Sequence, residues 1–182
     1  MEILILNGSP RLNGNTRTAL EEVIKGIREN TTGNNIELVH VAREKLSGCI
    51  NCDSCQSNGG QCVMPDNSAA MMEKVCKADI VIFGSPVYWW GVSSQLKMFI
   101  DKMYSKMGTL PDQKKKIGLV ITGQSDLSDP QYRIIGEQFA CICNYLGWDL
   151  VFTEPASTPE RTSLESDPGT RQKFALLWKK LA

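Results

Sequence analysis

The sequence of 182 residues lacks a surplus of either charge, and it lacks any long apolar run. Twenty lysine and arginine residues balance twenty aspartate and glutamate residues, so no excess positive charge points to nucleic acid or to an anionic membrane surface. No apolar run approaches the length that spans a membrane. These absences predict a protein that binds neither nucleic acid nor a membrane.

A targeting segment is also lacking. The chain opens with Met1 and Glu2 and passes directly into Ile3–Leu6, without the basic region and longer apolar stretch of a signal peptide. We therefore expect a cytoplasmic protein, whose seven cysteines are ligands, redox groups or core residues rather than disulfides. The single histidine, His40, ends a predicted strand and is expected to be structural.

Short apolar runs are present at regular intervals along the chain. Four of them lack polar-apolar alternation, which is typical of parallel strands covered on both faces. These runs are Ile3–Leu6, Ile80–Phe83, Ile117–Ile121 and Leu150–Phe152. A fifth run, Ile36–Val41, alternates more and is predicted to lie at an edge of the sheet.

Helical patterns separate these runs. Apolar residues recur at i, i+3, i+4 and i+7 from Leu20 and from Phe174, and at i, i+4, i+7 and i+11 from Val92 and from Ile135. A weaker helix is predicted over Ser68–Lys77. Five β-α units predict an α/β fold, a doubly wound five-stranded parallel sheet with helices on both faces. We expect residues 1–182 to form a single domain with a long cysteine-rich loop at 43–66.

Matching turns follow the first and third strands. One is Gly8-Ser9-Pro10 and the other is Gly84-Ser85-Pro86. In the flavodoxin-like strand order 2-1-3-4-5, these strands flank the point where the strand order reverses, which is where such sheets bind ligands. Glycine permits close approach of a ligand, and proline stiffens the exit from the turn.

The first turn leads into a helix with residues suited to an anion, namely Ser9, Arg11, Gly14, Asn15 and Thr16. A helix N-terminus presents free N–H groups, and the planar cation of an arginine suits phosphate. The alternative is an ordinary loop in which Asn15 or Thr16 caps the helix. An ATP-binding P-loop is disfavoured because it requires a lysine at the position of Asn15, and the dinucleotide motif G-x-G-x-x-G is absent.

The second turn continues as Val87-Tyr88-Trp89-Trp90-Gly91. Aromatic side chains beside a turn can pack on a flat ring while backbone groups bond its polar edge, and Gly91 gives such a ring room. The alternative is that an aromatic fills the core or a subunit interface, and for Trp90 this is at least equally reasonable.

Three segments together resemble the NAD(P)H-dependent FMN reductase superfamily, and within it the iron-sulfur flavoproteins. They are Gly8-Ser9-Pro10-Arg11 with Gly14-Asn15-Thr16, Gly84–Trp89, and Leu96-Lys97-x-Phe99-Ile100-Asp101. The similarity extends to about Gly147.

The resemblance implies that the FMN phosphate is held by Ser9, Arg11, Asn15 and Thr16. It also implies that the isoalloxazine is bordered by Pro86, Val87, Tyr88 and Trp89. A homodimer or homotetramer is implied too, with a neighbouring subunit closing the flavin pocket. Relatives often carry Asp-Asp-Met after the cysteines, where this chain has Asp66-Asn67-Ser68, a departure that bears only on the local loop conformation.

Cys49, Cys52, Cys55 and Cys62 have the spacing C-x2-C-x2-C-x6-C. A [4Fe-4S] cluster needs four converging thiolates, whereas structural zinc more often uses two separated C-x2-C pairs. The spacing looks most like that of the iron-sulfur flavoproteins, in which such a motif holds a [4Fe-4S] cluster near the flavin. Zinc, or no metal at all, remains an alternative. The other three cysteines are expected to be structural.

Three functions are compatible with these features. The first is an iron-sulfur flavoprotein that takes electrons at the cluster, for instance from a ferredoxin, and passes them through FMN to a small acceptor such as a quinone, dioxygen or a peroxide. The second is a cluster-free reductase driven by NAD(P)H. The third is a non-enzymatic electron carrier or a zinc-stapled module. None requires a catalytic acid or base.

Residues 154–167 are expected to be a mobile surface connector, with a lid or an intersubunit contact as alternatives.

Overall fold

The computed structural model of the chain describes residues 1–161 and 163–181. Its parallel strands stand in the order β2-β1-β3-β4-β5, which confirms the predicted flavodoxin-like sheet. The strands are β1 (Glu2–Asn7), β2 (Asn35–His40), β3 (Ile80–Pro86), β4 (Lys116–Gly123) and β5 (Asp149–Ser157). The more alternating strand, β2, lies at an edge as expected.

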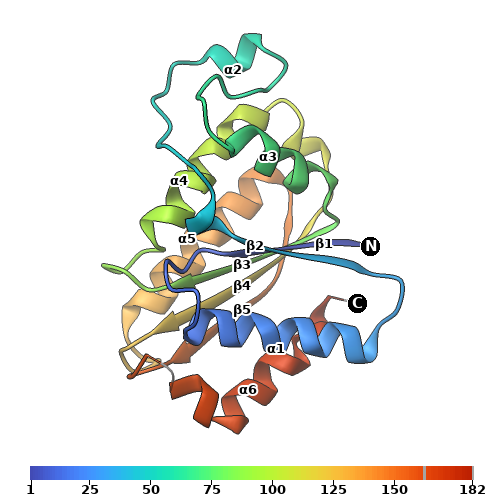
Figure 1. Cartoon of the computed structure of the whole chain (residues 1–182). Helices are drawn as coiled ribbons and strands as arrows, with labels where there is room; N and C mark the ends of the chain where they lie inside the picture. The colour runs from blue at the N-terminus through green and yellow to red at the C-terminus, as the bar shows by residue number, and fades with distance from the viewer. Residues whose placement is uncertain (162, 182) are drawn as a thin grey trace.

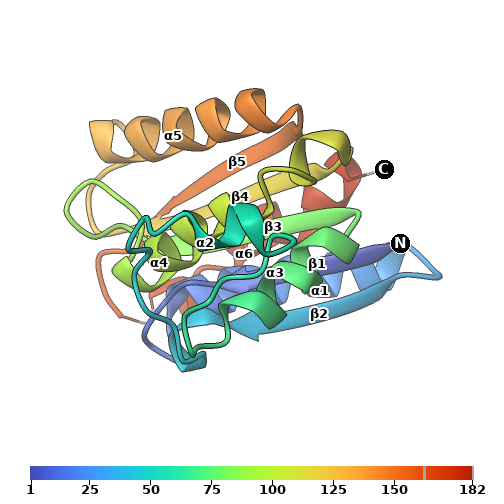
Figure 2. The same ribbon diagram turned by 90° about the horizontal axis from the view of Figure 1, so that it is seen from above.

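Helices cover both faces of the sheet (Figures 1 and 2). One face carries α1 (Asn15–Asn30) and α6 (Pro168–Ala175), and the other carries α3 (Ser68–Lys77), α4 (Ser94–Lys102) and α5 (Pro130–Leu146). The weaker helix predicted from the sequence has the same bounds as α3. The helix predicted to continue to Leu181 instead ends at Ala175, and the turns after it are a 3-10 helix.

Two hydrophobic cores lie on opposite sides of the sheet. In β1, Ile3 and Ile5 pack against the α1 and α6 side, while Leu4 and Leu6 pack against the α3, α4 and α5 side. Each of these four side chains is at most 3% exposed. Successive side chains of a strand point to opposite faces, so a strand covered on both faces needs a continuous apolar run.

The predicted loop at 43–66 rises from the end of β2, above α3 and α4, and returns to α3 (Figure 1). It contains one short helix, α2 (Ser54–Ser57), and no residue from 42 to 67 is buried. The loop therefore adds no buried residue to either hydrophobic core, although the partly buried Leu46 packs against the core on the α3, α4 and α5 side.

The loop predicted over 154–167 is partly wrong. Its first four residues extend β5 to Ser157, and a 3-10 turn forms at Ser163–Ser166, while Thr162 lies outside the described residues. An edge strand tolerates the polar residues and the proline in this extension.

No helix in the described part of the chain is long and apolar enough to cross a membrane.

Candidate functional site

A cleft of about 390 Å³ lies at the carboxyl ends of the strands, which is a volume typical of small-ligand sites. Its lining combines the two matching turns with the ends of β4 and β5. We call it the strand-end cleft. Eight of the ten predicted FMN-binding residues line it: Ser9, Arg11, Gly14, Asn15, Thr16, Pro86, Val87 and Tyr88.

The first turn is shaped by the buried side chain of Asn7 at the end of β1. The Asn7 Oδ1 accepts a hydrogen bond from the Ser9 N–H at 3.0 Å, and the Ser9 Oγ accepts one from the Arg11 N–H at 3.2 Å. The Asn7 Nδ2 donates to the Nδ1 of His40 at 3.2 Å. Burial, followed by nearby arginines, lowers the pKa of His40, so its ring stays neutral and can accept this bond. The role of His40 is structural, as expected.

The side chain of Asn15 does not cap α1, and neither does that of Thr16. The N-cap residue is Gly14, and it makes no side-chain bond. Asn15 instead donates from Nδ2 to the Glu160 carbonyl at 2.6 Å and accepts at Oδ1 from the Leu164 N–H at 3.0 Å. The capping alternative is therefore wrong. Helix geometry leaves the first N–H groups of α1 without helical partners, so they remain available to an anion.

Thr16 forms a buried hydroxyl pair with Thr122 at the end of β4, with 2.7 Å between the two Oγ1 atoms. This bond holds the start of α1 against the sheet. The Asn15 amide bonds the segment that follows β5 through both its nitrogen and its oxygen, so it fixes that segment to the first turn.

Sequence reasoning missed the segment Thr158–Arg161, which lines the strand-end cleft beside the first turn. Thr158 anchors it, because its N–H donates to the Gly123 carbonyl at 2.6 Å and its Oγ1 donates to the same oxygen at 3.1 Å. The segment brings a second guanidinium, that of Arg161, to the cleft that holds Arg11. The segment directly follows the last strand, and all the parallel strands end at this edge of the sheet. Its position in the sequence could therefore have indicated that it lines the cleft.

Gly8 and Gly84 are required for packing. Neither has a positive φ. A Cβ on Gly8 would lie 2.7 Å from the Leu96 Cβ, and one on Gly84 would lie 2.6 Å from the Leu20 Cδ1. The expectation that these glycines serve ligand approach is therefore corrected: they let helices sit directly on the two turns.

Ser93 joins the turns to α4. Its Oγ donates to the Gly8 carbonyl at 2.5 Å and accepts from the Leu96 N–H at 3.2 Å, while its own N–H donates to the Ser85 Oγ at 3.0 Å. All of these atoms are buried. These bonds fix the two turns relative to one another without a bound ligand.

The second turn forms a tight hairpin. Tyr88 and Gly91 exchange two backbone hydrogen bonds of 2.9 and 3.0 Å, and Trp89 and Trp90 occupy its tip with φ values of 48° and 57°. Gly91 closes this hairpin and does not line the cleft. Trp89 is 92% exposed and lines an adjoining open groove with Val87 and Tyr88. Trp90 is half exposed, so the alternative that it fills the core is wrong.

The residues of the strand-end cleft fit FMN. One end offers Arg11, Arg161 and the N-terminus of α1 to a phosphate, and the other offers Pro86, Val87 and Tyr88 to a flat ring. Arg11 forms no ion pair with any described residue, so its charge is free for a ligand.

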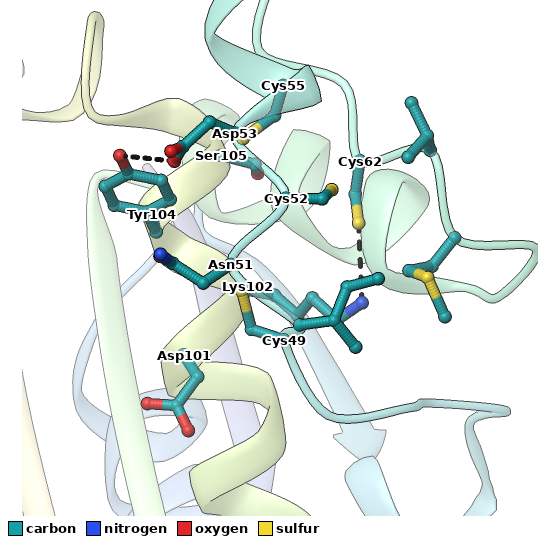
Figure 3. A pocket seen from close by; sticks show the side chains of 13 residues that line it. Cys49, Asn51, Cys52, Asp53, Cys55, Cys62, Asp101, Lys102, Tyr104 and Ser105 are labelled. Atoms are coloured by element: carbon teal, nitrogen blue, oxygen red, sulfur yellow. Dashed lines mark hydrogen bonds between the residues drawn. The ribbon is translucent and has the colours of Figure 1, made fainter.

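A second, much smaller pocket of about 20 Å³ is lined by all four cysteines of the predicted cluster motif (Figure 3). Its floor is the end of α4 and the 3-10 turn η2 (Met103–Lys106). We call it the cysteine pocket. Asn51 and Asp53 have φ values of 52° and 55° on either side of Cys52, so the backbone is in the left-handed region on both sides of this cysteine.

The cysteines have different protonation tendencies. Burial raises the pKa of Cys62, but hydrogen bonds from the Met64 N–H and neighbouring side chains, Lys102 among them, outweigh it and the net pKa is lowered. Hydrogen bonds from Ser54 lower the pKa of Cys52. Burial in the core raises the pKa of Cys143 on α5 to about 11, in agreement with a structural role.

The donor set of the cysteine pocket suits a four-thiolate cluster, because all seven cysteines are free thiols and four share one pocket. The geometry is incomplete. Within the described residues, no three cysteine, histidine or acidic side chains converge closely enough to hold a metal ion. The structure therefore gathers the ligands without bringing their sulfur atoms together.

The sequence model of the family described as NADPH-dependent FMN reductase matches residues 1–131. An iron-sulfur flavoprotein of Methanocaldococcus jannaschii is 38% identical over 102 residues, covering 56% of this chain and 51% of the relative. One of Archaeoglobus fulgidus is 34% identical over 131 residues, covering 72% and 58%. The chain thus spans little more than half the length of these relatives.

Solved structures share the fold at low identity. The FMN-dependent NADH-azoreductase of Bacillus anthracis, in complex with FMN, has a TM-score of 0.74 at 13% identity, and all of both chains is covered. The NAD(P)H:quinone oxidoreductase of Methanothermobacter marburgensis has a TM-score of 0.71 at 17% identity, with 100% of this chain and 96% of that chain covered. At these identities the likeness concerns the fold alone.

Proposed function

The chain belongs to the NADPH-dependent FMN reductase family, and from this we propose that it is an iron-sulfur flavoprotein, which passes electrons from a [4Fe-4S] cluster through FMN to a small acceptor. The observation that carries the proposal is the cysteine pocket, where Cys49, Cys52, Cys55 and Cys62 gather as free thiols. The names of the relatives from Methanocaldococcus and Archaeoglobus support it.

In this proposal the strand-end cleft holds FMN. Arg11, Arg161 and the first N–H groups of α1 bind the phosphate, while Pro86, Val87 and Tyr88 border the ring. Bound FMN supplies the electron transfer, and the protein positions it and controls access to it. The buried bonds of Ser93 and Asn7 keep the two turns in place, so little reorganisation accompanies binding.

The cysteine pocket and the strand-end cleft lie at opposite ends of α4. The helix is capped by Ser93, which is bonded to the first turn, and it ends at Lys102 beneath the cysteines. Nine helical residues span roughly 13 Å at 1.5 Å each. Cys49 and Cys52 are exposed, so an external donor such as a ferredoxin can approach the cysteine side while the acceptor uses the cleft.

The exposed hairpin supports a homodimer or homotetramer. Trp89 is 92% exposed and Trp90 is 50% exposed, beside the cleft. Large apolar side chains that project from a surface in this way are typical of an interface. In this proposal a neighbouring subunit covers the hairpin.

A cluster-free reductase driven by NAD(P)H is the second candidate. The specific observation in its favour is that the thiols of the cysteine pocket do not converge in the described part of the chain. In such an enzyme the four cysteines would remain thiols and the flavin would be reduced directly by the nicotinamide.

Anaerobic purification, followed by a visible spectrum and by assays of iron, acid-labile sulfide, zinc and FMN, tests the proposal. The expected result is one FMN with about four iron and four sulfide per chain. FMN without metal, together with rapid bleaching of the flavin by NAD(P)H, would favour the second candidate. Zinc in place of iron, or failure to bind FMN, would overturn the proposal.

A further inference from the structure

The two ends of the cysteine loop are tied together by the carboxylate of Asp66. Its Oδ2 accepts from the Ser47 N–H at 2.9 Å and from the Ser47 Oγ at 2.5 Å, and its Oδ1 accepts from the Ser68 N–H at 2.9 Å. We call these three residues the Asp66 knot. A further backbone bond of 2.8 Å runs from the Asn67 N–H to the Lys45 carbonyl beside it. The loop therefore leaves and re-enters the body at one place.

Lys102 reaches this knot from the last turn of α4. Its Nζ donates to the Asp66 Oδ2 at 3.3 Å and to the Cys62 Sγ at 3.4 Å, as Figure 3 shows for the cysteine. The side chain of Lys102 is 1% exposed and that of Asp66 is 4% exposed. An ammonium buried this deeply carries a large desolvation cost, so packing alone would favour a methionine or leucine at this place.

The pocket around Lys102 has little positive charge. Lys102 is the only cation among the described residues that line it, where the charged neighbours are Asp53 and Asp101. Ser105, one turn further on, has a buried hydroxyl without a partner in the described chain, and it lines the same pocket. The floor of the cysteine pocket thus offers one charged donor and one free hydroxyl to sulfur atoms above it.

We propose that Lys102 is a positioning residue of the cysteine pocket, whose ammonium fixes Cys62 against the Asp66 knot and donates to the Cys62 sulfur of a bound cluster. This inference rests on the proposed function. Hydrogen bonds to ligand sulfurs and nearby charge set the reduction potential of an iron-sulfur cluster. A cation beside a ligand sulfur stabilises the more negative, reduced cluster, so Lys102 raises the potential.

The test compares three variants with the wild type. Lys102→Met removes the ammonium but keeps a long apolar stem, and the hydrogen bonds from Ser47 and Ser68 still hold Asp66. Lys102→Arg keeps the charge and the donor. Lys77→Met is the matched control, because it removes the same charge from an exposed position in the last turn of α3, outside the cysteine pocket. Iron and FMN per chain and the cluster potential in an anaerobic redox titration are measured for each.

For Lys102→Met we expect a cluster with a lower reduction potential or, where the cluster is not retained, loss of iron with unchanged FMN. Lys102→Arg is expected to recover the iron content and most of the potential, and Lys77→Met to match the wild type. A wild-type potential at full iron content in Lys102→Met would overturn the inference, and so would a defect that Lys102→Arg does not repair. Wild-type protein without iron would instead overturn the proposed function, and the inference with it.

Discussion

The strand-end cleft is lined by short turns and the cysteine pocket by one long loop over the end of α4, and only the cleft has its groups in position before a ligand binds. The cleft has about 390 Å³ and is walled by turns that are fixed through buried bonds of Asn7, Thr16 and Ser93. The cysteine pocket has about 20 Å³, and its walls come from a loop with no buried residue between 42 and 67.

This difference has a physical consequence for the two cofactors. A ligand of the strand-end cleft meets groups already in position, so its binding energy is little reduced by ordering of the protein. A cluster in the cysteine pocket would have to draw the four thiols together, so its binding would also complete the folding of the loop. We therefore expect a single substitution in the cysteine pocket to reduce cofactor binding more than a single substitution in the strand-end cleft.

The largest contrast is expected from Cys52→Ala. Loss of one of four thiolates should remove essentially all of the iron, while FMN per chain stays unchanged because no cysteine lines the strand-end cleft. Metal and flavin assays on the purified variant measure both. Cys141→Ala, which removes an exposed cysteine outside the loop, is the control. Loss of FMN together with iron would mean that the two sites are not independent.

Alkylation of the metal-free protein at pH 8 distinguishes the loop thiols from the core thiol. Burial raises the pKa of Cys143 from 9.0 to about 11, so its thiolate fraction at pH 8 falls by about a hundredfold, whereas hydrogen bonds from Ser54 lower the pKa of Cys52. We expect rapid labelling of Cys52 by iodoacetamide and resistance of Cys143, read by peptide mass spectrometry. Comparable rates would show that the α5 face opens readily.

A smaller effect is expected from Arg11→Ala in the strand-end cleft. Removing a charge-assisted hydrogen bond of about 1.5–3 kcal/mol should weaken FMN binding by about ten- to a hundredfold. Quenching of flavin fluorescence in the apoprotein measures the affinity. Arg28→Ala, in the last turn of α1 and away from the cleft, should leave it unchanged. An unchanged affinity in Arg11→Ala would place the phosphate elsewhere.

The smallest effect concerns the hairpin beside the cleft. Trp90 has a φ of 57°, a conformation that costs an L-residue roughly 1–2 kcal/mol, so Trp90→Gly should stabilise the chain by about 1 kcal/mol. Gly147 has a φ of 66° at the end of α5, so Gly147→Ala should destabilise by a similar amount. Urea unfolding of both variants measures the free energy of unfolding, which should rise in Trp90→Gly and fall in Gly147→Ala. A less stable Trp90→Gly would mean that contacts of the indole outweigh the strain.

The fold was predictable because each buried strand is an apolar run that can only sit between two helical layers. The end of β5 was missed because Glu154 and Pro155 are poor strand residues, and an edge position tolerates them. The first turn and Arg11 were recognisable by spacing.

Contacts between distant residues were beyond the sequence. The bond from Asn15 to Glu160 spans 145 residues, and that from Lys102 to Cys62 spans 40. In both pairs, the sequence around one residue does not identify its partner, because only the packing of the helices on the sheet brings the two together.

The Asp66 knot also bears on how this fold can diversify. Ser47 and Ser68 bond one carboxylate, so the chain between them starts and finishes at a single anchor on the crossover from β2 to α3. Doubling the length of a flexible loop adds only about 0.6 kcal/mol of closure entropy. We therefore expect the crossover from β2 to α3 to tolerate insertion and deletion. The cysteine loop could be removed, lengthened or replaced by another peptide there, with the sheet, its two cores and the cleft retained.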